Sequence, residues 1–530
     1  MATATDTAKE VFIGGRWRSA ESSGSFQAID PSKNAAIEKE FPVSSWSDID
    51  AALDAAVEAW EELRRTPPAK IAEFLEAYAD AIDAAKAELA EVANRETALP
   101  VSPRLADVEI PRTSNQLRLA AKAARDGSWA LPTIDTAAGI RSVYRPLGPV
   151  AVFGPNNFPF AFNSVAGGDF AAAIAAGNPV IGKANSSHPD TTRMLAELAV
   201  GAVEKVGLPA STVQLIYRTG HADGERLVSD PRIGATGYTG ARTAGLKLKS
   251  AADKAGKPIY LELSSVNPVV ATAGALSSKR DAFVDDFLTS VLMGTGQFCT
   301  NPGLVILPAG DDADATVKQI AGRFDDAAVG TLLGPNVAKG LSGAIEKLVH
   351  FGATLVTGGG EPHSDRCAVA NTLLTVSGQE FLENPEGFQT EAFGNASLIV
   401  LCDDVDQMVA AIGHLEGNLT GCVYSADDGS EESDVDRLMF ALEPKVGRLL
   451  NDKMPTGVAV SAAMNHGGPY PATGHPGFTA VGVPGSLLRF GKLTSFDNVR
   501  ADRLPEALKD ENPMGGQRLV DGRWTDAAVG

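Results

Sequence analysis

Cysteine is scarce in this sequence, and positive charge is outweighed by negative charge. Only four cysteines occur in 530 residues, and no two of them form a Cys-x-x-Cys pair. A disulfide scaffold needs more cysteines and a structural zinc site needs clustered Cys and His ligands, so we expect reduced thiols and no metal site. The formal net charge of −20 argues against nucleic acid and anionic membrane surfaces as partners, because both demand clustered positive charge.

Long apolar runs are also missing. No window approaches the apolar length that a membrane-spanning helix needs, and the initial MATATDTAKE has no basic segment followed by an apolar one. We therefore expect a cytoplasmic protein without a secretory leader. The composition is 44% hydrophobic and 21% charged, which is ordinary for globular chains, and 530 residues suffice for two or three domains.

Apolar β-rich segments alternate with Ala-rich helical segments along the chain. This alternation predicts an α/β fold in which helices cover both faces of parallel sheets. Residues 48–98 have apolar side chains at helical spacing and predict two amphipathic helices. Strands are predicted in GPVAVF, NPVIGK and IGATGY, and a fourth in PIYLELSSVNPVVA. Glycine or polar residues follow three of these strands, at the places where open α/β sheets bind ligands.

Two of these strand ends are candidates for a nucleotide site. The turn from Gly240 to Gly245 opens a predicted helix, so its N–H groups and the helix dipole could hold a pyrophosphate, although the turn lacks the GxGxxG pattern and could be a tight connection. Lys183 follows another strand, where its ammonium could bind a ribose hydroxyl or a 2′-phosphate, or be solvated. No acidic residue lies between Lys183 and Asp190 to select a free 2′-hydroxyl, which favours NADP.

Three polar side chains are candidates for chemistry, and each has a plain structural alternative. Cys299 in GQFCTNPG is either a nucleophile or a small buried hydrophobe, the role that we assign to the other cysteines. Glu262 in IYLELSS is either a solvent-facing strand residue or a partly buried general base with a raised pKa. Asn157 in GPNNFPF is either a turn residue or a side-chain donor to an oxyanion.

Together and in this order, the motifs resemble those of the aldehyde dehydrogenase family. The resemblance runs from FIGGRWRSA to about Phe490 and covers nearly the whole chain. GPNNFPF is similar to the oxyanion loop of the family, GYTGARTAG to its phosphate-binding turn and LELSSVNP to its general-base segment. GQFCTNPG is similar to the nucleophile loop, and TEAFGNA to the segment that holds the nicotinamide ribose.

The resemblance implies a covalent mechanism. Cys299 would attack an aldehyde, and Asn157 with the Cys299 N–H would hold the oxyanion. Hydride would then pass to the nicotinamide, and Glu262 would activate water to hydrolyse the thioester to an acid. A free cysteine has a pKa of about 8.5, so we expect the site to lower it or to form thiolate when the cofactor binds. The implied cofactor-binding residues are Lys183, Ser186, Gly240, Ala241, Gly245, Glu391 and Phe393.

Departures from the usual family pattern indicate one branch of the family. Ser264 and Ser265 stand where most members have two glycines, nothing basic lies between Asn157 and Lys183, and NHGGPYPATGHP replaces the usual Pro-Phe-Gly-Gly segment. These features are similar to a branch of 2-oxoglutarate semialdehyde dehydrogenases and long-chain aldehyde dehydrogenases that is typically NADP-linked. In that comparison, Ser186 replaces the glutamate of NAD-preferring relatives. The resemblance therefore implies NADP as cofactor, with NAD possible.

The aldehyde itself is not fixed by the motifs. The resemblance favours 2-oxoglutarate semialdehyde, and a long-chain aliphatic aldehyde is the alternative. A semialdehyde with a distant carboxylate needs a cation or several donors, whereas a fatty aldehyde needs an apolar tunnel. The aromatic candidates for the lining suit either substrate or a hydrophobic core: Phe158, Phe160, Phe298 and Phe478.

Two other function classes stay open. A cysteine hydrolase or acyltransferase would pair Cys299 with a histidine base, but no histidine lies within the matched motifs, and His466 and His475 fit a Gly/Pro-rich loop better. A non-catalytic structural protein on the same fold is the other class. The joint presence of Asn157, Glu262 and Cys299 argues against it.

The resemblance also implies the domain organisation. A Rossmann-type NAD(P)-binding domain would comprise residues 1–127 and 147–266, and an α/β catalytic domain residues 267–480. Residues 128–146 and 481–530 would form a small oligomerisation flap. Such enzymes pair sheet edges between subunits, so we expect a homodimer or homotetramer.

One short match has no assigned role. GGRW at residues 14–17 is echoed by DGRW at residues 521–524. Four residues are too few to indicate an internal repeat, so the match is either chance or marks a terminal strand that packs on a neighbouring subunit.

Overall fold

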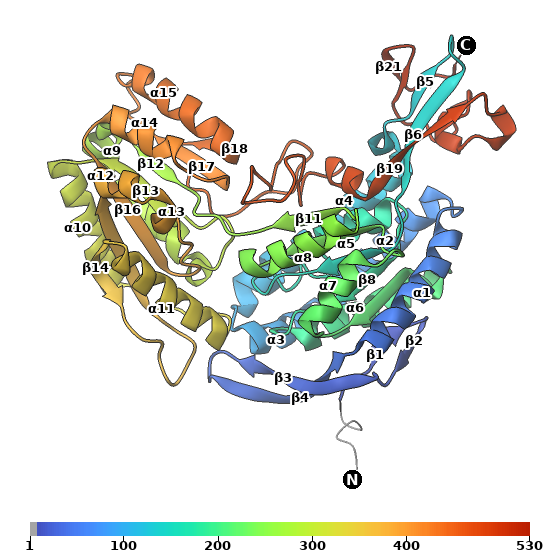
Figure 1. The fold of residues 1–530 in the computed structure, drawn as a ribbon, viewed down its shortest axis with the longest axis horizontal. Coiled ribbons are helices and arrows are strands. Elements are labelled where there is room, and N and C mark those ends of the chain that lie inside the picture. Colours follow the sequence, from blue (N-terminus) through green and yellow to red (C-terminus); the bar gives the residue numbers. More distant parts are fainter. Residues whose placement is uncertain (1–7, 530) are drawn as a thin grey trace.

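The computed structural model describes residues 8–529, and the segment 1–7, to which the leader prediction refers, lies outside the described residues. Two α/β lobes lie side by side, and a smaller sheet projects from the lobe that contains the N-terminal half of the chain (Figure 1). A two-stranded ribbon, β3 (Ser22–Asp30) with β4 (Ala35–Ser44), lies beneath the lobes. Among the described residues, no helix is long and apolar enough to cross a membrane.

The sheet of the first lobe has seven strands. They are β1 (Val11–Ile13), β2 (Arg16–Arg18), β7 (Val150–Phe153), β8 (Val180–Lys183), β9 (Val213–Ile216), β10 (Ala235–Thr239) and β11 (Ile259–Glu262). Their order is β11-β10-β7-β8-β9-β1-β2, and β7 to β11 run parallel. From β7 the chain proceeds to β8 and β9 on one side and then returns to β10 and β11 on the other. The crevice outside β7 and β10 is therefore the topological switch point, where such sheets bind ligands.

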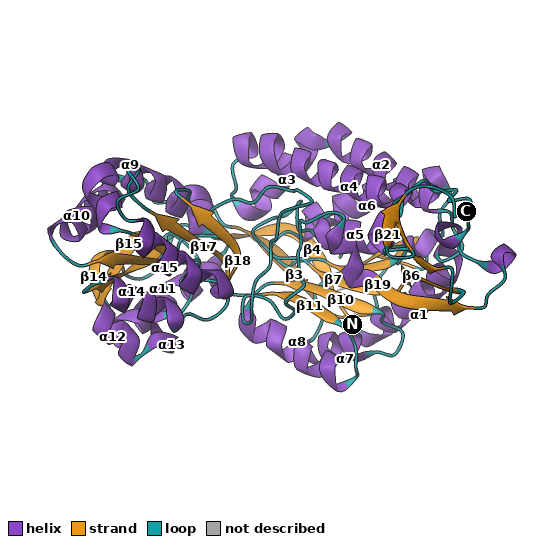
Figure 2. Cartoon of the chain, turned by 90° about the horizontal axis from the view of Figure 1, so that it is seen from above, coloured by secondary structure: helices purple, strands orange, loops and turns teal. Residues whose placement is uncertain are grey.

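Helices cover both faces of this sheet (Figure 2). They are α1 (Trp46–Leu63), α2 (Pro68–Ala84), α3 (Lys86–Thr97), α4 (Ile110–Asp126), α5 (Gly168–Ala175), α6 (Pro189–Val206), α7 (His221–Ser229) and α8 (Arg242–Lys254). A π-helical segment, Val101–Glu109, leads into α4. Residues 48–98 form three helices and not the predicted two. The chain leaves the helix at Ala85, with φ −91° and ψ 8°, and no Gly or Pro marks this break in the sequence.

The sheet of the second lobe also has seven strands. They are β12 (Val269–Ala271), β13 (Leu304–Pro308), β14 (Thr354–Gly359), β15 (Ala370–Ser377), β16 (Ala396–Cys402), β17 (Asn418–Tyr424) and β18 (Val446–Asn451), in the order β14-β15-β16-β13-β12-β17-β18. All neighbours except β14 and β15 run parallel. The helices of this lobe are α9 (Ala273–Leu292), α10 (Asp311–Asp326), α11 (Pro335–His350), α12 (Gly378–Glu383), α13 (Pro385–Phe388), α14 (Val405–Gly413) and α15 (Glu432–Leu442).

The chain crosses between the lobes inside a segment predicted as a single strand. PIYLELSSVNPVVA forms β11 in the first sheet and β12 in the second. Asn267 between them has a φ of 48°, a left-handed conformation that extended strands do not adopt, and Pro268 follows it. The prediction of one strand is therefore wrong, and the crossing places Glu262 at the boundary of the two lobes.

The projecting sheet joins two distant parts of the chain. It contains β5 (Thr133–Asp135), β6 (Ile140–Pro146), β19 (Gly491–Asp497), β20 (Arg518–Val520) and β21 (Arg523–Thr525), in the order β19-β6-β5-β20-β21. The segments predicted to form the oligomerisation flap thus lie side by side in one sheet, while their role in assembly stays a prediction.

The GGRW and DGRW matches are both tight hairpins. Gly14 and Gly15 connect β1 to β2 with φ of 64° and 75°, and Asp521 and Gly522 connect β20 to β21 with φ of 46° and 79°. Two consecutive residues with positive φ are typical of two-residue turns between twisted antiparallel strands. The match reflects one turn type used twice, in two different sheets.

Candidate active site

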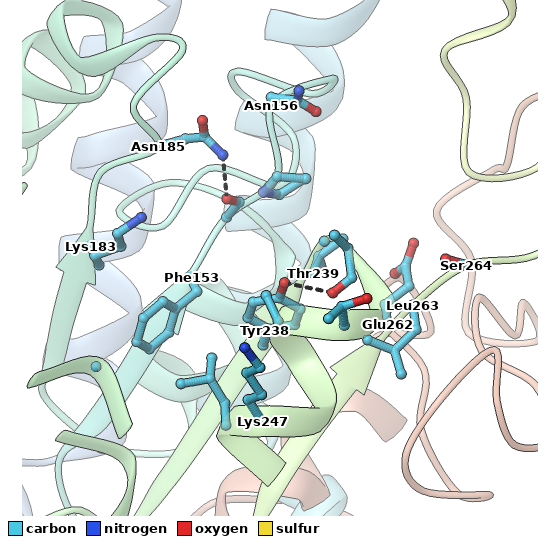
Figure 3. Close-up of a pocket in the computed structure, with 18 of the residues that line it drawn as sticks. Phe153, Asn156, Lys183, Asn185, Tyr238, Thr239, Lys247, Glu262, Leu263 and Ser264 are labelled. Atoms are coloured by element: carbon cyan, nitrogen blue, oxygen red, sulfur yellow. Dashed lines mark hydrogen bonds between the residues drawn. The ribbon is translucent and has the colours of Figure 1, made fainter. Parts of the chain in front are cut away.

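A cavity of about 740 Å³ lies outside the carboxyl ends of β7, β8, β10 and β11, where the second lobe faces the first. Figure 3 shows Lys183 and Asn185 on one side of it, and Glu262, Leu263 and Ser264 on the other. The sequence-predicted residues that line it are Asn157, Lys183, Gly240, Ala241, Glu262, Cys299, Glu391 and Phe393.

Cys299 lies in a loop that a close backbone approach holds in place. Gly296 has a φ of 69°, and a Cβ on it would come within 2.0 Å of the carbonyl oxygen of Gly394. Only glycine fits there, because the position combines left-handed backbone with direct backbone contact. The nucleophile loop is thereby fixed against the TEAFGNA segment, which carries Glu391 and Phe393.

A histidine joins the two predicted reactive side chains. The Nε2 atom of His466 lies 3.3 Å from the Cys299 sulfur and 3.0 Å from Oε1 of Glu262. His466 and Glu262 are only 1% and 2% exposed. The prediction that His466 is a loop residue without a role beside Cys299 is wrong. The residue does belong to a loop, but the loop folds back so that its ring packs 5.7 Å from that of Phe162, between centroids.

These three side chains are far apart in the sequence and close in space. Cys299 is separated from His466 by 167 positions, and Glu262 by 204. Their ligand atoms all lie within 4.8 Å of one another, a set that soft metal ions can bind. Sequence spacing gave no sign of this group. The absence of a resident metal stays a prediction.

The protein groups around Cys299 favour the neutral thiol. Burial raises the pKa of the Cys299 thiol well above its ordinary value, the negative charge of Glu262 raises it further, and the positive charge of Arg112 lowers it. Of the two expected routes to the thiolate, a pKa lowered by the site itself is wrong, because an apolar environment beside a carboxylate disfavours a second negative charge. Thiolate formation on cofactor binding stays a prediction. His466 provides a proton acceptor within reach of the sulfur.

Glu262 is buried because the C-terminal loop covers the end of β11. An isolated antiparallel bridge joins Glu262 to Thr473, and the N–H of Leu263 donates to the carbonyl of Ala472 at 2.8 Å. The solvent-facing alternative is thus excluded. The second carboxylate oxygen, Oε2, is buried without a hydrogen-bond partner in the part of the chain that the structure describes.

Asn157 and Glu391 flank the cluster of Cys299, His466 and Glu262, which we call the reactive group. Asn157 is 6% exposed and donates through Nδ2 to the carbonyl of Gln297 at 3.0 Å, two residues before the nucleophile. An amide nitrogen has two hydrogens, so a second donor remains for a substrate oxygen. Glu391 accepts from the Ser265 N–H at 3.2 Å, and burial raises its pKa to about 7.

The family model described as "Aldehyde dehydrogenase family" matches residues 17–443 of this chain. The chain belongs to the aldehyde dehydrogenase family. It is 40% identical over 516 residues to alpha-ketoglutaric semialdehyde dehydrogenase 2 of Azospirillum brasilense, covering 95% of this chain and 97% of the relative. It is 35% identical over 499 residues to alpha-ketoglutaric semialdehyde dehydrogenase of Acinetobacter baylyi, covering 92% and 93%.

Solved structures of aldehyde dehydrogenases share the fold. Aldehyde dehydrogenase C of Pseudomonas syringae, in complex with NAD+ and octanal, has a TM-score of 0.78 at 20% identity over 93% of this chain and 97% of that one. Lactaldehyde dehydrogenase of Escherichia coli has a TM-score of 0.77 at 20% identity over 92% and 98%. The family, the α/β aldehyde dehydrogenase fold and the oxidoreductase class expected from the sequence are confirmed.

Six predicted site residues of this aldehyde dehydrogenase lie outside the cavity lining: Gly245, Ser186 and the four aromatic candidates Phe158, Phe160, Phe298 and Phe478. Gly245 lies inside α8, where a Cβ would come within 2.5 Å of the Leu263 side chain, so its absence of a side chain permits close packing of the helix on the strand. Ser186 is not part of the lining, whereas Asn185 is. Phe160 is fully buried in the core of the first lobe.

The other aromatic candidates of the aldehyde dehydrogenase form one cluster beside the reactive group. Phe158 and Phe298 adjoin Asn157 and Cys299 in the sequence, and their ring centroids lie 5.4 Å apart in an edge-to-face arrangement. Phe478 and Phe162 belong to the same buried cluster. Their role in substrate binding stays a prediction.

Proposed function

We propose that this enzyme oxidises 2-oxoglutarate semialdehyde to 2-oxoglutarate, with NADP preferred and NAD usable. The identity of 40% and 35% to two alpha-ketoglutaric semialdehyde dehydrogenases over nearly the whole chain carries the substrate assignment. The long-chain aldehyde alternative has less support. The octanal complex of Pseudomonas syringae is only 20% identical, which speaks for the fold and not for the substrate.

The proposed chemistry starts at Cys299. His466 takes the thiol proton, and the thiolate sulfur bonds to the aldehyde carbon to give a thiohemiacetal. Its oxyanion accepts hydrogen bonds from the second amide hydrogen of Asn157 and from the Cys299 N–H; one such donor is commonly worth about 3 to 4 kcal/mol in the transition state.

The second half of the reaction releases the acid. A nicotinamide cofactor in the cavity would supply the hydride acceptor. The thiohemiacetal carbon would lose its hydride, and a thioester on Cys299 would remain. Water then attacks the thioester and gives a proton to Glu262, whose Oε2 has no protein partner. The carbon–sulfur bond breaks, and the sulfur takes back the proton that His466 holds. Glu262 and the new carboxylic acid release their protons to water, so the products are the carboxylate and the regenerated cysteine.

The residues around the cavity fit a nicotinamide dinucleotide. Thr243 and Ala244 in the first turn of α8 line the cavity, and the N–H groups of a first helical turn have no acceptor within the helix, so they suit a pyrophosphate. Glu391 and Phe393 line the same cavity and would hold the ribose next to the nicotinamide.

The NADP preference rests on two cations. Burial lowers the pKa of Lys183 to about 8, and the positive charge of Arg218 adds to this effect. A 2′-phosphate between the two would relieve their mutual repulsion, because phosphate prefers paired cationic donors. Neither Ser186 nor any other residue between Lys183 and Asp190 supplies an opposing carboxylate.

A second activity is favoured by the contact between Cys299 and His466. A cysteine with a histidine base can cleave activated esters without a nicotinamide cofactor. We propose ester hydrolysis as a side reaction of the same thiol, dependent on both residues.

One experiment separates these functions. Purified enzyme is mixed with 2-oxoglutarate semialdehyde or decanal, each with NADP or NAD, and the absorbance of the reduced cofactor is followed; a nitrophenyl ester without cofactor is the parallel arm. The proposal expects the highest kcat/KM with the semialdehyde and NADP, and no reduction by Cys299→Ala. A higher kcat/KM with decanal would overturn the substrate, and ester cleavage without any aldehyde oxidation would overturn the dehydrogenase function.

We also propose a homodimer or homotetramer in the cytoplasm. The projecting sheet ends at β19 and the sheet of the second lobe at β18, and Leu493 on β19 is 55% exposed. Open edges with exposed apolar side chains suit pairing with another subunit. A monomeric mass by light scattering would contradict this assembly.

A further inference from the structure

Arg112, which packs on the aromatic cluster beside the reactive group, lacks a carboxylate partner. Arg112 lies in the first turn of α4, and its Nε donates to Oε1 of Gln116 at 3.2 Å. Its Nη2 is buried and has no hydrogen-bond partner within residues 8–529. A buried guanidinium nitrogen without an acceptor is costly, so an acceptor from outside the chain would stabilise Arg112.

The carboxylate nearest in sequence is fully occupied. Glu109 pairs with Arg104 through Oε2, and its Oε1 accepts from the N–H groups of Phe160 and Ala161 at 2.9 and 3.0 Å. Arg104, which stacks on the same aromatic cluster, is thus already neutralised. Arg489 at the other end of the cluster pairs with Asp169 at 2.7 Å. Nε of Arg104 and Nη2 of Arg489 also lack a hydrogen-bond partner, but each of these guanidinium groups has a carboxylate partner. Arg112 differs from both because no acidic side chain of the described chain forms an ion pair with it.

Arg112 packs on the aromatic cluster that lies beside Cys299 and His466. Its guanidinium carbon lies 5.8 Å from the centroid of Phe158 and 5.5 Å from that of Phe162. The centroid of the His466 ring lies 5.7 Å from the same Phe162 centroid, so Arg112 and His466 both contact the Phe162 ring. Burial lowers the pKa of Arg112, and the charges of Glu109, Cys299 and Glu262 act in the opposite direction, which shows that the reactive side chains are within electrostatic reach.

We propose that Arg112 binds the carboxylate of the semialdehyde substrate while its aldehyde carbon lies at Cys299. The proposal rests on the proposed function and deepens it, because it names the cation that a substrate with a distant carboxylate requires. A carboxylate matches the planar fork of a guanidinium, and the aromatic rings exclude water from the pair. Gln116 positions the guanidinium: its Oε1 accepts from Arg112, and its Nε2 donates to the carbonyl of Ala161 at 3.0 Å. An aliphatic aldehyde would leave Arg112 unpaired.

The test compares two aldehydes that differ in the carboxylate. The kcat/KM with NADP is measured for 2-oxoglutarate semialdehyde and for pentanal, in the wild type, Arg112→Gln and Arg112→Lys. The ratio of the two values is the readout, because the effect of Arg112 on the thiol pKa applies to both aldehydes and cancels. Arg118→Gln is the matched control: it lies on the same helix, and its exposed guanidinium pairs with Asp80 and Asp83.

We expect the ratio of semialdehyde to pentanal to fall about 10- to 100-fold in Arg112→Gln, mainly through a higher KM for the semialdehyde, since a charge-assisted hydrogen bond is lost. Arg112→Lys keeps the charge without the fork and gives an intermediate ratio, and Arg118→Gln leaves the ratio unchanged. An equal loss of kcat/KM for both aldehydes would show that Arg112 has a structural role. That result would overturn the proposal that Arg112 binds the carboxylate, but not the proposed substrate. If the wild type oxidises pentanal and not the semialdehyde, both the anchor and the proposed substrate are overturned.

Discussion

The two sides of the cavity are built in different ways. On the cofactor side, the ends of β8 and β10 and the first turn of α8 present backbone groups. The charged side chains that line it are Lys183, Lys247 and Glu225, and Arg218 acts electrostatically on Lys183. On the reacting side, distant segments contribute side chains: Cys299 comes from a tight loop, and His466 from the C-terminal loop. The cofactor side therefore depends on how closely the backbone packs, whereas the reacting side depends on individual side chains. Single substitutions should therefore affect cofactor binding and catalysis separately.

The largest effect is expected from the nucleophile. Cys299→Ala should lower NADP reduction by about 10³-fold or more, because the covalent route is lost. It should leave NADP binding intact, since no backbone packing changes. Steady-state kinetics and fluorescence titration with NADPH measure the two properties, and a variant that lost both would show that the two sides are not separable.

His466→Gln should have the second largest effect. Loss of the proton acceptor should lower kcat/KM about 10²-fold near neutral pH. Burial and Glu262 raise the pKa of the Cys299 thiol, so less thiolate forms without His466, and the rate of the variant should increase further as pH rises. A pH profile of kcat/KM checks this, with His475→Gln in the same loop as the control. A profile identical to that of the wild type would mean that His466 does not handle the thiol proton.

Gly245→Ala should damage the cofactor side and leave the reacting side intact. The added Cβ would come within 2.5 Å of the Leu263 side chain and within 2.9 Å of the Tyr238 ring, which pushes α8 away from the sheet. Overpacking of this kind costs about 1 to 3 kcal/mol of folding free energy. We expect a higher KM for NADP and a lower melting temperature, with cofactor-independent ester cleavage retained. Gly256→Ala is a poor control because its φ is positive, so Gly201→Ala in α6, which has open space around it, is preferred.

The smallest effect should come from Arg218, because it is exposed. Arg218→Ala should lower the preference for NADP over NAD, measured as the ratio of the two kcat/KM values, by about 10-fold or less, since screened charges contribute little. The ratio should fall through NADP alone. A variant with an unchanged ratio would assign the 2′-phosphate to Lys183 only.

The sequence predicted residues that follow regular strands or lie in recognisable motifs, and it missed two that do neither, His466 and Arg112. Asn157, Lys183 and Glu262 come at strand ends, where the period of apolar residues gives their place, and Cys299 was found through the motif around it. His466 lies in a Gly- and Pro-rich loop without a period, so only the folded chain shows that it reaches Cys299. Arg112 has an ordinary amphipathic pattern around it, and its missing partner is a property of packing.

Helix and strand boundaries show the same limit. The helical pattern of apolar residues ran without interruption through Ala85, and apolar residues continued on both sides of Asn267-Pro268, yet the chain breaks at both positions. Apolar spacing reports that a segment is buried, but it does not report which sheet or helix buries it. The assignment of PIYLELSSVNPVVA to one strand failed for this reason, although it correctly placed Glu262 at a strand end.

The most direct test of the account is a search for the acyl-enzyme in Glu262→Gln. This variant is mixed with 2-oxoglutarate semialdehyde and NADP, NADPH is followed through the first turnover, and the quenched protein is analysed by peptide mass spectrometry. The account predicts a burst of about one NADPH per active site, slow turnover afterwards and a thioester on Cys299, because hydride leaves before Glu262 is needed. A burst without an adduct on Cys299, or no NADPH at all while the wild type is active, would contradict it.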